Sequence, residues 1–135
     1  GMNFNELIEA AGGLKEGCEK VISGGPMMGF AMYTTDTPIT KTSSSILCMS
    51  KDEVSACEPT ACINCGRCVD ACPSRIIPSR LADFAERHDE EAFLKFNGLE
   101  CVECGSCSYV CPAKRQLKQA IGSMRKTALA NKKKK

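Results

Sequence analysis

A short cysteine motif occurs twice in the second half of this 135-residue chain and constrains its fold more than any other feature. The motif reads Cys-x2-Cys-x2-Cys-x3-Cys-Pro, a pattern typical of bacterial [4Fe-4S] proteins. A cubane cluster needs four thiolates at the corners of a tetrahedron, and three cysteines spaced by two residues can surround one side of it. The repeat therefore predicts two [4Fe-4S] clusters and eight cysteine ligands: Cys62, Cys65, Cys68, Cys72, Cys101, Cys104, Cys107 and Cys111.

The fourth cysteine of each motif is followed by a proline and is expected to point away from the other three. In two-cluster ferredoxins this cysteine ligates the cluster of the other motif. Gly66 and Gly105, each directly after the second cysteine, should let the backbone approach a cluster closely. The expected ligand sets are Cys62, Cys65, Cys68 and Cys111 for cluster 1, and Cys101, Cys104, Cys107 and Cys72 for cluster 2.

Structural zinc is the main alternative, because zinc sites made of four cysteines also use Cys-x2-Cys pairs. Zinc would use two such pairs and leave four further thiols without a role. A disulfide framework is disfavoured because the eleven cysteines are odd in number and most lie in two tight groups. No signal peptide is recognised, so we expect a reducing cytoplasmic setting. Cys18 and Cys48 are expected to be small buried residues, and Cys57 a free thiol or a spare ligand.

The rest of the chain predicts an α+β protein. Residues 3–13 predict a helix, because Asn3 and Glu6 have the spacing of a capping box and two glycines can end it. Short apolar runs at residues 19–23, 29–33 and 44–50 predict strands. We expect a small helix-and-strand part at residues 2–50, a connection at 51–60, a mainly helical two-cluster domain at 61–131, and a disordered basic tail at 132–135.

Apolar residues recur at helical spacing in two further segments. One helical face is expected between the motifs, continuing after a polar break near Asp89, and another after the second motif. The first comprises Ile77, Leu81, Phe84 and Ala85, followed by Phe93 and Phe96; the second comprises Leu117, Ile121, Met124 and Ala128.

Charge is segregated along the sequence. Residues 114–135 carry nine Lys and Arg side chains and no acidic one, although the net charge of the chain is only +2. Such a tail fits a solvated helix, or a helix that contacts an acidic protein or an anionic membrane surface. Binding of nucleic acid is a third possibility, but we do not expect nucleic acid as a partner. No run approaches the roughly 18 apolar residues that a spanning helix needs.

No catalytic constellation accompanies the cysteines. A glycine-rich phosphate loop after a strand is missing, and the single histidine, His88, cannot supply a Ser/His/Asp arrangement. We therefore expect no complete active site in this chain alone, and leave open whether it is an enzyme.

The order of "NFNELIEAAGG", "KVISGGPMMGFAM", "TPITKTSSSIL" and the two cysteine motifs resembles the C-terminal half of the RnfC family of electron transport complex proteins. The resemblance implies a partial soluble-ligand-binding β-grasp (SLBB) part followed by a helical double [4Fe-4S] ferredoxin domain. It also implies an NADH-linked, ion-translocating ferredoxin:NAD oxidoreductase, with flavin and NADH bound by a domain or chain outside this sequence. The expected partners are that domain and other subunits of the complex, on the cytoplasmic side of the cell membrane.

Two other functions remain open. A cobalamin reductase-type flavoprotein uses a similar iron–sulfur module, and a non-catalytic binding module could hold clusters for structure alone. In either case, hydrogen bonds to the sulfur atoms and solvent exposure set the reduction potentials of the clusters.

Overall fold

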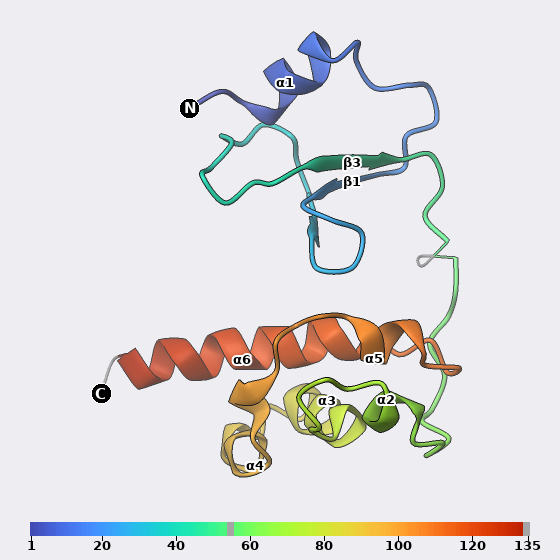
Figure 1. Ribbon diagram of the computed structural model, residues 1–135, viewed down its shortest axis with the longest axis vertical. Helices are drawn as coiled ribbons and strands as arrows, with labels where there is room; N and C mark the ends of the chain where they lie inside the picture. The colour runs from blue at the N-terminus through green and yellow to red at the C-terminus, as the bar shows by residue number, and fades with distance from the viewer. Residues whose placement is uncertain (54–55, 134–135) are drawn as a thin grey trace. The chain divides into compact units, whose positions relative to one another are not determined.

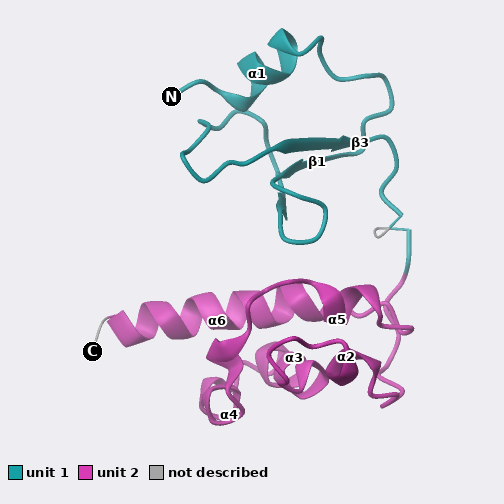
Figure 2. Cartoon of the chain, viewed as in Figure 1, with its two compact units in different colours: residues 1–57 teal, residues 58–135 magenta. Residues whose placement is uncertain are grey.

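The computed structural model describes residues 1–53 and 56–133. The chain forms two compact units, residues 1–57 and residues 58–135, coloured separately in Figure 2. The boundary lies inside the connection expected at residues 51–60, of which Val54 and Ser55 lie outside the described residues. Each unit is described by itself below.

The first unit is one helix and a small antiparallel sheet (Figure 1). Its elements are α1 (Phe4–Ala10), β1 (Lys20–Ser23), β2 (Phe30–Ala31) and β3 (Ile46–Met49), and the strand order is β2-β1-β3. All three predicted strands and the predicted helix are confirmed. The capping box also forms: Asn3 Oδ1 accepts from Asn5 N–H at 3.0 Å, and Asn3 N–H donates to Glu6 at 3.1 Å.

The sheet buries little of its surface. Among the described residues of this unit, the buried apolar ones are Phe4 and Ile8 of α1 and Ile22 of β1. In contrast to the expectation of two buried thiols, Cys48 is exposed and Cys18 is half-buried. The reason is that β3 is an edge strand of a three-stranded sheet, so a side chain on one of its faces has little to cover it.

The second unit is helical, as predicted. It contains α2 (Arg67–Asp70), α3 (Pro78–Glu86), α4 (Glu90–Lys95), a 3-10 turn η1 (Gly98–Glu100), α5 (Ser106–Tyr109) and α6 (Leu117–Lys133). The long helix α6 packs against α3, α4 and α5, and α2 packs against α5 (Figure 1). Nine residues form the buried core: Ile76, Leu81, Ala82, Ala85, Phe93, Cys107, Leu117, Ile121 and Met124.

Helix α6 continues further than expected. It ends at Lys133, so Lys132 and Lys133 of the predicted disordered tail are helical, while Lys134 and Lys135 lie outside the described residues. The helix extends because its good helix formers continue without a Gly or Pro stop after Gly122. Within residues 1–53 and 56–133, no helix is both long and apolar enough to cross a bilayer.

Gly98 is required by the close approach of η1 to an aromatic ring. A Cβ atom at this position would collide with the ring of Phe93, which is fully buried. Replacing Gly98 with Ala should therefore destabilise the helical unit by about 1–3 kcal/mol, the usual effect of overpacking a core. For a unit of this size each kcal/mol lowers the melting temperature by roughly 4–8 °C, measurable by far-UV circular dichroism on the anaerobically purified chain.

Gly122→Ala is the matched control. A Cβ atom on α6 at Gly122 would lie 3.2 Å from Oε2 of Glu103, a flexible side chain that can move. Helix propensity favours Ala there by about 0.5–1 kcal/mol, so the melting temperature should hold or rise. Equal losses in both variants would show that the Phe93 ring does not set the requirement.

Candidate metal centres

The two cysteine motifs fold in the same way. In each, a glycine with a left-handed backbone precedes a short helix, Gly66 (φ 77°) before α2 and Gly105 (φ 85°) before α5. Non-glycine residues adopt positive φ at two further matching places: Asn64 (53°) and Glu103 (55°), and Arg75 (52°) and Lys114 (53°). The sequence repeat is therefore also a repeat of backbone conformation.

The motif-1 cavity lies beside the loop of the first motif. Four cysteines line it: Cys62, Cys65 and Cys68 from the first motif, and Cys111 from the second. The other lining residues are Ile63, Asn64, Gly66, Ser79, Pro112, Ala113, Arg115 and Leu117.

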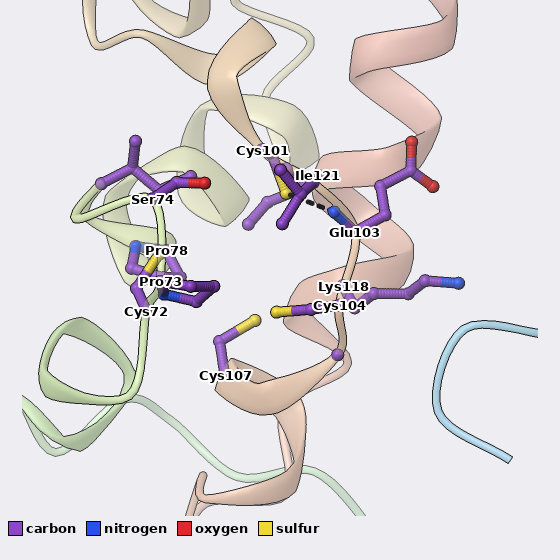
Figure 3. Close-up of a pocket in the computed structure, with 13 residues that line it drawn as sticks. Cys72, Pro73, Ser74, Pro78, Cys101, Glu103, Cys104, Cys107, Lys118 and Ile121 are labelled. Carbon is purple, nitrogen blue, oxygen red and sulfur yellow. Dashed lines mark hydrogen bonds between the residues drawn. The ribbon is translucent and has the colours of Figure 1, made fainter.

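The motif-2 cavity has the reciprocal composition. Cys101, Cys104 and Cys107 come from the second motif, and Cys72 comes from the first. In Figure 3, Cys72 and Pro73 stand on one side of the cavity and the three cysteines of the second motif on the other. Each cavity thus brings together three cysteines of one motif and the fourth of the other. Cys57 is exposed and lines neither cavity.

The two cavities border the same helix ends. At the start of α3, Pro78 lines the motif-2 cavity and Ser79 the motif-1 cavity. At the start of α6, Leu117 lines the motif-1 cavity and Lys118 the motif-2 cavity. Neighbouring residues therefore face different cavities, which keeps the two close together.

The thiols differ in their surroundings. Cys62 and Cys65 of the motif-1 cavity are exposed, whereas Cys107 of the motif-2 cavity is only 9% exposed. Burial raises the pKa of Cys107 to about 11 and also raises the pKa of Cys101. The Ser106 hydroxyl, 3.5 Å from Cys104 Sγ, lowers the pKa of Cys104.

One backbone amide already donates to a sulfur atom. Glu103 N–H donates to Cys101 Sγ at 3.4 Å, the dashed line in Figure 3. Hydrogen bonds of this kind favour thiolate ligands. Four thiols around each cavity fit the donor set of a cubane cluster. Among the residues that the structure describes, no group of three or more His, Cys, Asp or Glu side chains is arranged to hold a single metal ion.

Two arginines, Arg115 and Arg125, form ion pairs beside the cavities. Arg115 donates to Asp83 at 2.8 Å and to Glu86 at 2.9 Å. Burial alone would lower the pKa of Arg115, but these two hydrogen bonds outweigh it and raise the pKa. Beside the motif-2 cavity, Arg125 donates to Glu103 at 3.1 Å. None of these ion pairs was expected from the sequence, although a comparison of the two motif copies position by position would have singled out Arg115 and Glu103.

Comparisons with known proteins agree with this chemistry. Residues 61–115 match the family model described as a 4Fe-4S dicluster domain. The chain is 42% identical over 134 residues to the C subunit of the Na(+)-translocating ferredoxin:NAD(+) oxidoreductase complex of Acetobacterium woodii, covering 99% of this chain and 30% of that protein. It is 50% identical over 122 residues to the C subunit of the proton-translocating ferredoxin:NAD(+) oxidoreductase complex of Clostridium ljungdahlii, covering 90% and 27%.

A third relative is named as the same component of such a complex. The C subunit of the ion-translocating oxidoreductase complex of Methanosarcina acetivorans is 45% identical over 121 residues, covering 90% of this chain and 27% of that protein. The chain therefore spans less than a third of the length of these relatives. The resemblance predicted from the sequence is confirmed.

Removal of iron should unfold much of the helical unit. Four cysteines, Cys68, Cys72, Cys101 and Cys111, pack against its core, so ligands that hold them also support the core. We expect iron-free protein to be largely unstructured from Cys57 to Pro112, with a clear loss of helical signal in far-UV circular dichroism.

Alkylation of the iron-free chain by iodoacetamide at pH 8 gives an independent readout. An unfolded segment should react at similar rates at all eight motif cysteines. A persistent fold would instead favour Cys104 and protect Cys107, because a pKa of about 11 leaves only about 0.1% thiolate at that pH. A cooperative melting transition with unchanged helical signal would also contradict the prediction.

Proposed function

The chain belongs to the RnfC family, the C subunits of ion-translocating oxidoreductase complexes, and we propose that it relays electrons through two [4Fe-4S] clusters. The observation that carries the proposal is the pair of cavities, each lined by four cysteines contributed by both motifs. A relay needs two redox centres at short range within one rigid body, and the shared borders at α3 and α6 meet that need.

The proposed ligands follow the lining of the cavities. Cluster 1 takes Cys62, Cys65, Cys68 and Cys111, and cluster 2 takes Cys101, Cys104, Cys107 and Cys72. When bound, such clusters accept and release single electrons without breaking covalent bonds. The protein's own contribution is to hold the thiolates, to donate N–H groups such as that of Glu103, and to exclude water from Cys107.

The proposed setting is a larger assembly. The curated relatives are named as parts of ion-translocating ferredoxin:NAD(+) oxidoreductase complexes, and this chain spans only about 30% of one of them. We propose that a flavin- and NADH-binding domain or partner chain exchanges electrons with the clusters. The small sheet of residues 2–50 fits a partial β-grasp of the SLBB type, and the basic residues of α6 suit contact with an anionic membrane surface on the cytoplasmic side.

Anaerobic reconstitution tests the relay. The wild-type chain should bind about eight irons and show two clusters that dithionite reduces and that couple magnetically. Clusters that bind but resist dithionite would favour a structural role instead. About four irons per chain would contradict the two-cluster proposal.

Exchange of ligands between the motifs is tested with Cys72→Ala. The variant should keep cluster 1 and lose or alter cluster 2, because Cys72 lines the motif-2 cavity. Iron content should fall toward about four per chain, and mass spectrometry after alkylation should find Cys101, Cys104 and Cys107 labelled.

Two controls accompany this variant. Cys111→Ala should give the reverse labelling, with the first three cysteines of motif 1 exposed to the reagent. Cys57→Ala, at a thiol that lines neither cavity, should bind as much iron as the wild type. Loss confined to cluster 1 in Cys72→Ala would mean that each motif serves its own cluster.

A further inference from the structure

The two cavities are built from equivalent positions that carry different charges. Arg115 is the fourth residue after Cys111, and the fourth residue after Cys72 is Ile76. Arg115 lines the motif-1 cavity and Ile76 lines the motif-2 cavity. The repeat thus places an arginine at one cavity and an apolar residue at the matching place of the other, and the guanidinium of that arginine donates to Asp83 and Glu86.

The charge of Arg115 is better shielded from water than the charges of its partners. Its side chain is 12% exposed, whereas those of Asp83 and Glu86 are 44% and 57% exposed. Water screens the two carboxylates more strongly, and neither lines the motif-1 cavity. Because two carboxylates lie against one guanidinium, the effect of this group on a cluster in that cavity depends on the difference in screening.

The charged residues that line the motif-2 cavity are Glu103 and Lys118. Glu103, which lines it, is paired with Arg125, and both side chains are partly exposed at 23% and 30%. Figure 3 shows the Glu103 carboxylate and the Lys118 amine pointing away from the thiols. Asn64, the motif-1 counterpart of Glu103, is neutral, so no carboxylate lines the motif-1 cavity.

Solvent exposure also favours reduction of a cluster in the motif-1 cavity over one in the motif-2 cavity. An oxidised cubane with four thiolates carries about −2, and reduction adds a further negative charge. Desolvation disfavours the more highly charged state. The buried Cys107 belongs to the motif-2 cavity, and the exposed Cys62 and Cys65 belong to the motif-1 cavity. Reduction is therefore easier in the motif-1 cavity on both counts.

We propose that Arg115 raises the reduction potential of cluster 1 above that of cluster 2, so that a single electron on the chain resides at the motif-1 cavity. The inference rests on the proposed function, since it presupposes two reducible clusters. The electron lost by cluster 2 is the electron gained by cluster 1, and no further reactant is needed. The chain is thus a relay with a preferred end, and the exposed cysteines stand at that end.

A potentiometric titration followed by electron paramagnetic resonance tests the proposal on the reconstituted full chain. Wild type should give two midpoints. Arg115→Gln should lower the higher midpoint by about 59 mV, which corresponds to a tenfold change in the distribution of one electron, and leave the lower midpoint in place. Arg115→Lys, which keeps the charge, should stay near wild type.

Lys114→Asn is the matched control, because it removes a charge from an exposed neighbour with a positive φ that Asn tolerates. It should move neither midpoint.

A second variant tests the proposal if Arg115→Gln does not hold clusters. The double variant Asp83→Asn, Glu86→Gln removes the two carboxylates paired with Arg115, so it should raise the higher midpoint.

Several results would overturn the inference: equal midpoints in wild type, a shift of the lower midpoint in Arg115→Gln, unchanged midpoints in that variant, or no rise in the double variant. A wild-type chain that dithionite cannot reduce, or that holds one cluster, would defeat the relay itself before any variant is measured. The two failures are therefore distinguishable.

Discussion

Each cysteine cavity depends on both motifs. The first three cysteines of one motif line only part of each cavity. The turn at the Cys-Pro pair of the other motif brings the fourth cysteine to the same cavity. The turn carrying Cys72 leads into α3, and the turn carrying Cys111 leads into α6. The same two turns therefore complete the cavities and lead into α3 and α6, the helices that pack against each other.

The apolar core and the thiols are also physically continuous. Cys107 belongs to the core itself, in the same cluster of buried residues as Leu81 and Ile121. A small core is usual for a helical unit of this size, and additional stabilisation by a metal or a disulfide is common in such domains. Here four of the proposed ligands, Cys68, Cys72, Cys101 and Cys111, pack against the core, so packing and the proposed ligation would support the same helices.

Much of this could be predicted because periodicity and spacing are local. The capping box at Asn3 and the buried faces of α3, α4 and α6 depend on neighbours in the sequence. The prediction was wrong for Ile77, which precedes α3 as its N-cap and is exposed. The expected exchange of the fourth cysteine also agrees with the lining of the cavities, although ligation itself remains a prediction.

The predictions that failed concern features that contacts between distant parts of the chain determine. The exposure of Cys48 does not follow from its own stretch of sequence, because nothing there reveals that β3 is an edge strand. The pairing of Arg115 with Asp83 joins residues 32 positions apart, and spacing within a motif does not predict such a contact. Helix α6 continues through Lys133 because helix propensity outweighs the repulsion expected in a run of lysines.

Both motif loops hold non-glycine residues in left-handed conformations, at Asn64 and Arg75 and again at Glu103 and Lys114. Such a conformation is unfavourable by about 1–2 kcal/mol for an ordinary residue, although Asn tolerates it, so Arg75, Glu103 and Lys114 above all oppose the folded loops. Under the proposed function, cluster ligation would hold these conformations, so a newly made chain gains little by adopting them before the clusters bind. The two loops would then order in one step, when the clusters bind, and neither half of the unit would gain from being completed early.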